Sequence, residues 1–174
     1  MSDAFTKYLI KIYLPSFIYL VKNILYCGGD NVIILAVDPG KARTGLAICD
    51  KTMFLASPLC VIEEYNRYRL ADKIAEQAKL HKAELLVVGL PRNMDGSEGE
   101  SAKSARELGD KLGQLTGLPV KMQDERCTTM IAHRYLSDNN VRGKKRKQTV
   151  DAAAATVILQ TYLDYIKNMA GKES

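Results

Sequence analysis

ILAVDPGKARTGLAICD, residues 34–50, places a charged side chain at the end of a strongly apolar run. Residues 34–37 are all apolar, and a continuous run of this kind predicts a strand that is covered on both faces of its sheet. Asp38 follows directly, and burying a carboxylate costs free energy unless another group compensates its charge. A metal ion, the nearby Arg43 or backbone N–H donors could each do so, and this stretch alone leaves the three open.

The composition is that of an ordinary soluble globular protein with one main domain. The 174 residues are 47% hydrophobic and 26% charged, with a formal net charge of +5, which is a modest indication of an anionic partner. The four cysteines show no zinc-site spacing and nothing that demands an oxidising compartment. We therefore expect a cytoplasmic protein.

An apolar segment, residues 8–27, precedes the main domain. Its charge-free run between Lys11 and Lys22 contains Pro15 and is shorter than the roughly 20 apolar residues of a membrane span. A signal peptide and an interfacial membrane helix are alternatives, but we expect an accessory helix packed on the domain or on a partner, without membrane contact. The predicted division is an N-terminal hydrophobic extension and linker at 1–31, the main domain at 32–168 and a tail at 169–174.

Hydrophobic periodicity predicts a layered α/β domain. Three strands come first, and the short gaps between them favour antiparallel neighbours. Helices and strands then alternate, which predicts a mixed sheet with an antiparallel half and helices on its faces. The expected strands are 32–38, 44–49, 53–62, 83–91 and 119–123, and the expected helices are 67–82, one through 105–115, one from about 128 to 138, and 148–168.

Three carboxylates lie at positions that this order would bring to one edge of the sheet. Asp38 ends the first strand, Glu125 follows the fifth, and Asp151 lies at the start of the last helix. Their repulsion would raise a pKa or require cations, and oxygen ligands suit Mg²⁺ or Mn²⁺. Two such ions can promote hydrolysis of a phosphodiester. Alternatively, Glu125 could pair with Arg126, and Asp151 could simply favour a helix N-terminus.

Four motifs, in this order, resemble one family. They are DPGKARTGLAICD (38–50), VVGLPRNMDGSEGE (87–100), DERCTT (124–129) and KKRKQTVDAAAATVILQTYLD (144–164). Together they closely resemble the bacterial YqgF family, a ribonuclease H-like group described as Holliday junction resolvases and pre-16S rRNA nucleases. The resemblance covers about residues 32–168. It implies a ribonuclease H-like mixed five-stranded sheet with helices on both faces.

The resemblance also implies a metal-dependent nuclease, with Mg²⁺ or Mn²⁺ bound by the catalytic residues Asp38, Glu125 and Asp151. Asp124 would be a substitute or a helper. The implied activity is processing of the 5′ end of pre-16S rRNA, with Holliday junction resolution, which favours a homodimer, as the alternative. Related junction resolvases carry a second acid one turn further along the last helix, but Ala154 stands there, which favours a site that holds one ion tightly.

Basic residues are the predicted contacts to the nucleic acid, an rRNA precursor or branched DNA. Most lie in RGKKRK, residues 142–147, which we expect to form a loop against phosphates, although a solvated loop without a ligand is the alternative. The predicted contacts are Arg43, Arg142, Lys144, Lys145, Arg146 and Lys147.

Glycine-containing turns supply a predicted phosphate loop, made of Gly40, Gly96 and Ser97. Glycine lets the backbone bend toward a ligand, and the helix that follows could bind phosphate through its free N–H groups. The alternative is an ordinary capping box of Ser97 and Glu100. By the resemblance, Gly40 and Gly45 would shape the hairpin after the first strand.

Two other classes of function stay open at this point. An actin-like or sugar-kinase-like nucleotide binder also places an Asp-x-Gly hairpin at phosphates, but it normally needs two such domains. A non-catalytic nucleic-acid-binding protein of the same fold is the other, and Ala154, in place of a second acid on the last helix, keeps it open.

Overall fold

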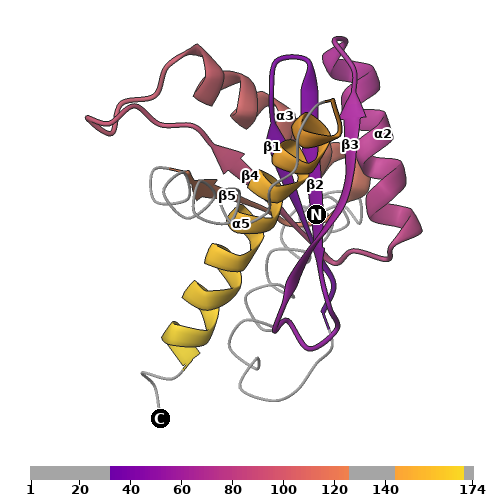
Figure 1. The fold of residues 1–174 in the computed structure, drawn as a ribbon, viewed down its shortest axis with the longest axis vertical. Helices are drawn as coiled ribbons and strands as arrows, with labels where there is room; N and C mark the ends of the chain where they lie inside the picture. Colours follow the sequence, from indigo (N-terminus) through magenta and orange to yellow (C-terminus); the bar gives the residue numbers. More distant parts are fainter. Residues whose placement is uncertain (1–31, 126–143, 171–174) are drawn as a thin grey trace, which may run out of the picture.

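The structure is a computed structural model that describes residues 32–125 and 144–170, with side chains omitted for 144–151 and 170. A five-stranded sheet in the order β3-β2-β1-β4-β5 forms its centre (Figure 1). The strands are β1 (Ile34–Pro39), β2 (Arg43–Cys49), β3 (Ala56–Glu63), β4 (Leu85–Leu90) and β5 (Val120–Asp124). The helices are α2 (Arg67–Leu80), α3 (Glu100–Thr116) and α5 (Lys144–Ala170).

The sheet is mixed, as the element order predicts. β2 pairs antiparallel with β1 and β3, whereas β4 pairs parallel with β1 and β5. The short connections among the first three strands allow hairpins, and each parallel crossover carries a helix. As a result, β1, β4 and β5 all end at the same edge of the sheet, which we call the carboxyl edge.

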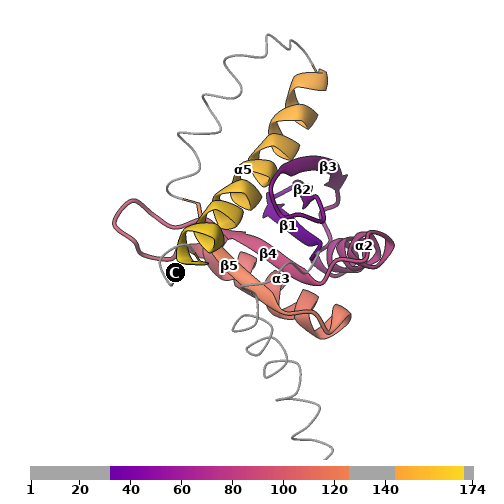
Figure 2. The same ribbon diagram turned by 90° about the horizontal axis from the view of Figure 1, so that it is seen from below.

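Both faces of the sheet are covered, and the strand residues alternate between two cores. Ile34 and Ala36 of β1 pack with Ile158 and Leu159 of α5. Leu35 and Val37 pack on the other face, with the buried residues of α2 and α3. Figure 2 shows α5 on one side of the sheet and α2 and α3 on the other. The predicted ribonuclease H-like architecture, with helices on both faces, is confirmed.

Two local predictions were wrong. α5 begins at Lys144, so most of the basic run forms the first turns of a helix and not a loop. α3 has Gly99 as its N-cap and no side-chain capping bond, so Ser97 and Glu100 do not form a capping box. The helix expected at about 128–138 and Arg142 lie outside the described residues, as does the N-terminal segment. No described helix is long and apolar enough to cross a membrane.

Candidate active site

Asp38 lies at the carboxyl edge, in the middle strand of the sheet. Asp38 pairs with Gly45 across the β1–β2 hairpin, and the preceding Val37 pairs with Val88 of β4. Because successive residues of a strand point to opposite faces, Asp38 shares the α5 side with Ala36. The side chain is half-buried, so its charge lies where the apolar core meets solvent.

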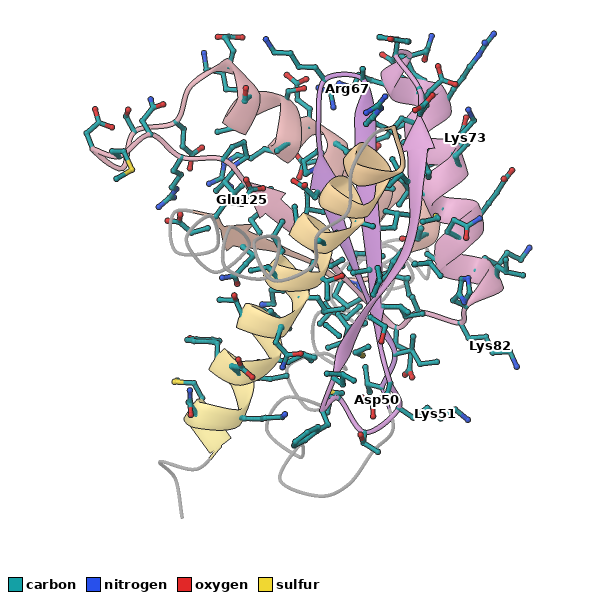
Figure 3. The ribbon with its side chains drawn as sticks, in the orientation of Figure 1. Asp50, Lys51, Arg67, Lys73, Lys82 and Glu125 are labelled. Carbon is teal, nitrogen blue, oxygen red and sulfur yellow. The ribbon has the colours of Figure 1, made fainter. Side chains whose placement is uncertain are left out.

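Glu125 follows β5 and reaches the same region across the end of β4. Its N–H donates to the carbonyl of Leu90 at 3.3 Å, which continues the β4–β5 pairing by one residue. A Cβ atom on Gly89 would overlap Oε1 of Glu125 and would lie 2.8 Å from Cδ1 of Ile158. Glycine at this position therefore leaves the space that the Glu125 carboxylate occupies. Figure 3 places Glu125 at the carboxyl edge, far from the turn that carries Asp50 and Lys51.

The charge of Glu125 is disfavoured at this position. Burial raises the pKa of its carboxyl group from 4.5 to about 7, and the negative charges of Asp38 and Asp124 add to the increase. β4 lies between the strands of Asp38 and Glu125, which are therefore about 10 Å apart at the usual strand spacing. The charge of Asp38 nevertheless affects the pKa of Glu125, so the two side chains extend toward each other. A half-buried pair of carboxylates of this kind would be stabilised by a bound cation.

Asp151 lies in α5, and the direction of this helix determines its position along the sheet. Gln160 accepts a hydrogen bond from the N–H of Ala56 at 2.9 Å and donates to the carbonyl of Phe54 at 3.3 Å. These residues flank the start of β3, at the edge opposite to the carboxyl edge. The N-terminal half of α5 therefore extends toward the carboxyl edge, and position 151 lies two turns before Ile158, which packs at Gly89.

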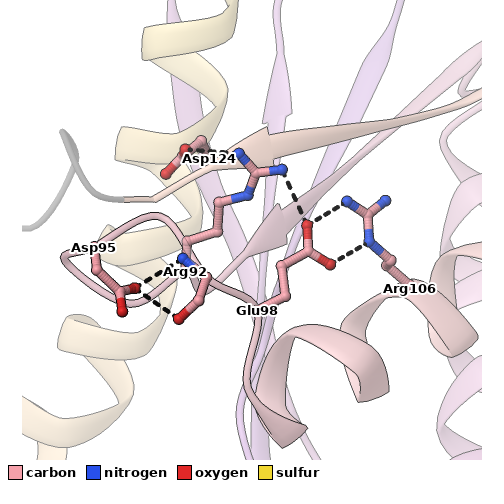
Figure 4. Close-up of polar contacts among 6 residues, drawn as sticks. Arg92, Asp95, Glu98, Arg106 and Asp124 are labelled. Atoms are coloured by element: carbon pink, nitrogen blue, oxygen red, sulfur yellow. Dashed lines mark hydrogen bonds and ion pairs between the residues drawn. The ribbon is translucent and has the colours of Figure 1, made fainter.

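A network of ion pairs borders this region on the α3 side (Figure 4). Nη2 of Arg92 donates to Oε1 of Glu98 at 3.0 Å, and Nη1 lies 3.7 Å from Oδ2 of Asp124. Arg106 of α3 holds the same Glu98 through two hydrogen bonds, at 2.7 and 2.6 Å. These bonds, with a smaller one from Arg92, lower the pKa of Glu98 to about 2. The sequence prediction missed Arg92, Glu98 and Arg106, because the network depends on the approach of Arg92 to Asp124 of β5 and of Glu98 to Arg106 of α3.

The loop between β4 and α3 is ordered by its own polar groups. The hydroxyl and the N–H of Ser97 both donate to Oδ1 of Asp95, at 2.6 and 2.8 Å, and Asn93 donates to the Ser97 hydroxyl at 2.8 Å. Gly96 has a φ of 86°, in the region that favours glycine. In this conformation, the N–H of Ser97 is directed to Asp95, so a phosphate would have to displace the carboxylate to reach it.

Of the predicted nucleic-acid contacts, the structure describes Arg43 and the backbone of residues 144–147. Nε of Arg43, at the start of β2, donates to Glu63 of β3 at 3.0 Å. Gly40 lies in the β1–β2 turn, and a Cβ there would overlap the carbonyl of Arg43, so this turn requires glycine. The backbone of Lys144, Lys145, Arg146 and Lys147 forms the N-terminal turns of α5, on the side where position 151 lies.

The model of one protein family matches this chain over residues 32–165, that is, over the whole sheet and most of α5. The family is RuvX, described as Holliday junction resolvase. The chain belongs to this family.

The sequences of two relatives align with this chain over most of their own length. A protein of Anaeromyxobacter sp. (strain Fw109-5) is 44% identical over 132 residues, which are 75% of this chain and 95% of the relative. A protein of Streptococcus agalactiae serotype III is 40% identical over 135 residues, 75% of this chain and 96% of the relative. Both are named "Putative pre-16S rRNA nuclease".

The fold of this family member is also found in a distant resolvase. The structure of T. thermophilus RuvC in complex with a Holliday junction substrate superimposes with a TM-score of 0.53, at 14% identity, over 77% of this chain and 96% of RuvC. This similarity shows the fold, which is ribonuclease H-like. It does not test the predicted roles of the three acidic residues.

The described side chains supply only part of a metal site. No group of three His, Cys, Asp or Glu residues comes together among them, and the side chain of Asp151 is not described. Asp38 and Glu125, which do approach each other, carry carboxylates, the ligand type that Mg²⁺ and Mn²⁺ prefer. Gly89 keeps the space for the Glu125 carboxylate, and the nearby charge of Asp38 adds to the rise in its pKa that burial causes. The residues therefore fit a divalent ion.

Proposed function

We propose that the protein is a metal-dependent nuclease that processes the 5′ end of pre-16S rRNA, with Asp38, Glu125 and Asp151 as its catalytic and metal-binding residues. Hydrolysis of phosphodiester bonds follows from membership of the RuvX family. The observation that carries the site assignment is the approach of Glu125 to Asp38 across Gly89, where burial and like charge raise the pKa of Glu125. The names of the relatives support the RNA substrate.

The proposed roles follow from the places of the residues. Asp38 and Glu125 would hold Mg²⁺ or Mn²⁺ from neighbouring positions of the carboxyl edge, and Asp151 would close the site from α5. The ion would supply Lewis-acid stabilisation of the negative charge that develops on the phosphate. The apolar core below, including Ile158, excludes water from one side of Glu125 and strengthens its electrostatic interactions.

A side-by-side cleavage assay tests this function. A 5′-extended 16S rRNA precursor and a synthetic four-way DNA junction are each incubated with the protein in Mg²⁺, in Mn²⁺ and in chelator. We expect metal-dependent cutting of the RNA at a defined position. Preferential cutting of the junction would instead favour resolution, the function named in the family description. Cutting of neither substrate, while nucleic acid is still bound, would favour a non-catalytic binder.

Without metal, the protein should become less stable as the pH rises from about 4.5 to about 7. The pKa of Glu125 is raised to about 7, so in this window the folded protein holds a proton that the unfolded chain releases. The free energy of unfolding, measured by urea denaturation in chelator, should therefore fall across the window. Glu125→Gln should flatten this part of the profile, and an unchanged profile would contradict the assigned pKa.

Metal should act in the opposite sense over the same pH range. A divalent ion binds the ionised carboxylate, so the concentration of Mn²⁺ that half-saturates the protein should fall as the pH rises through about 7. Calorimetric titration without nucleic acid measures this directly. A pH-independent affinity would mean that Glu125 is not a ligand.

Neutralising the start of α5 should weaken binding to nucleic acid in a salt-dependent way. If Lys144, Lys145 and Lys147 each contact a phosphate, replacing all three by Gln should reduce the slope of log K against log salt by about 0.7–0.9 for each lost contact. Gln also retains good helix propensity, so the helix should persist. Binding measured in chelator over a salt series gives the slope, and an unchanged slope would identify a solvated helix end without phosphate contacts.

A further inference from the structure

Asp124 and Glu125 are adjacent in sequence but are directed to opposite faces of the sheet. Glu125 packs at Gly89 and Ile158, on the α5 side. Asp124 lies 3.7 Å from Arg92, on the side of α3. The alternation of strand residues separates them in this way, and it gives the two carboxylates different surroundings.

Arg92 connects Asp124 to Glu98, a residue that is itself held in place. Its guanidinium lies between Asp124 and Glu98, as Figure 4 shows. Glu98 in turn accepts two hydrogen bonds, from Nε and Nη2 of Arg106, a geometry that is stronger and more directional than a single contact. Nε of Arg92 is buried and makes no hydrogen bond among the described residues, so its two Nη groups make the contacts.

The end of β5 needs an anchor of this kind. Within the described residues, β5 is an edge strand of five residues that pairs only with β4, and its last backbone bond is the one from Glu125 to Leu90. Ends of edge strands open more readily than strands in the middle of a sheet. Any displacement there would move Glu125 away from Asp38.

We propose that Arg92 is a positioning residue of the nuclease site, which ties the end of β5 to α3 and so fixes the place from which Glu125 reaches over Gly89. Asp124 is the point of attachment and not a metal ligand. This inference rests on the proposed function. It assigns roles to Arg92 and Asp124 through Glu125, which would itself contact the ion.

The test separates positioning from charge. Arg92→Lys keeps the positive charge, but a single ammonium group lacks the planar fork that reaches Glu98 and Asp124 at the same time. Arg92→Gln removes the charge as well, and Asp124→Asn removes the attachment. The matched control is Arg69→Gln, an equal charge change on an exposed residue of α2 whose side chain makes no ion pair or hydrogen bond within the described residues.

Three measurements are made on each variant of the full chain: Mn²⁺ affinity by calorimetry without nucleic acid, kcat and KM in Mg²⁺, and nucleic-acid Kd in chelator. We expect Arg92→Lys, Arg92→Gln and Asp124→Asn each to weaken Mn²⁺ binding and to lower kcat by roughly tenfold or more, the usual effect of losing a group that orients a ligand. KM and Kd should stay at the wild-type value. The double variant Arg92→Lys with Asp124→Asn should be little worse than either single variant.

Three outcomes would overturn the inference. Wild-type Mn²⁺ affinity and kcat in Arg92→Lys would mean that only the charge matters. A weaker Kd with a reduced salt slope in Arg92→Gln would identify a direct phosphate contact. An equal loss in Arg69→Gln would show a general charge effect. A wild-type protein that cuts no substrate would instead contradict the proposed function, while the Mn²⁺ titrations would still decide the role of Arg92.

Discussion

Asp38→Asn should abolish cleavage while the protein stays folded. Asparagine keeps the size of the side chain and one oxygen, but it lacks the charge that a divalent ion requires. Loss of one member of a catalytic set that acts as a unit lowers kcat by about three orders of magnitude or more. Glu125→Gln and Asp151→Asn should behave in the same way, and combining them should add little. Nucleic-acid binding in chelator should survive, because the basic residues of α5 are unchanged.

Thermal melts of the same variant distinguish a metal site from a structural pair. Above about pH 7 without metal, Asp38→Asn should be at least as stable as the wild type, because Asp38 is one of the charges that raise the pKa of Glu125. Wild-type protein should gain about 2.7 kcal/mol at a metal concentration of 100 Kd, and the variant should gain far less. A structural pair of Asp38 with Arg43 predicts the reverse, a destabilised protein. A destabilised Asp38→Asn that still cuts would end the assignment.

Gly89→Ala should have the second largest effect, although glycine carries no chemistry. The added methyl group would occupy the position of Oε1 of Glu125 and would press on Ile158. Overpacking of this kind costs about 1–3 kcal/mol, and the movable group is the carboxylate. We therefore expect kcat to fall by about 100-fold, the upper end of what misplacing a metal ligand costs.

The control for Gly89→Ala is Gly113→Ala in α3. A Cβ at Gly113 would lie 3.5 Å from Val120, which is an ordinary contact, and alanine favours a helix. This variant should keep full activity and should melt no lower than the wild type. Placing Gly89→Ala in the Glu125→Gln background shows whether the two act together. If the loss of activity is as large in that background as in the wild type, Gly89 acts by another route.

The fold could be predicted from the sequence because its determinants are periodic and local. The aliphatic runs of β1 and β4 indicate strands covered on both faces, and both lie between two cores. The start of α5 was misjudged, because a run of basic residues resembles a solvated loop, and the first turn of the helix has no acidic residue. The capping role of Ser97 was also misjudged, because Asp95, two residues earlier, takes its hydroxyl and N–H.

The candidate site was only partly accessible from the sequence. Asp38 could be proposed as a site residue because a charge ends an apolar strand. Gly89 has no such signal, since its role depends on Glu125, which is two strand positions beyond its register partner Gln123. The role of Arg92 likewise depends on its contacts with Asp124 and Glu98, and the spacing of these three residues in the sequence does not indicate that they meet. Pairs of this kind are set by strand register, which emerges only when the sheet is assembled.

α5 has a consequence for the order in which the protein is made. This helix comes last along the described chain, yet it supplies one whole side of the core through Ala155, Ile158 and Leu163. Among the described residues, a nascent chain that ends before residue 144 therefore lacks the helix that covers this side of the sheet, and Ala56 lacks its partner Gln160, 104 residues away. Contacts over such separations form late and slowly. Asp151 arrives on the same helix, so a partly synthesised molecule would have no complete set of acidic residues while it is still attached to the ribosome.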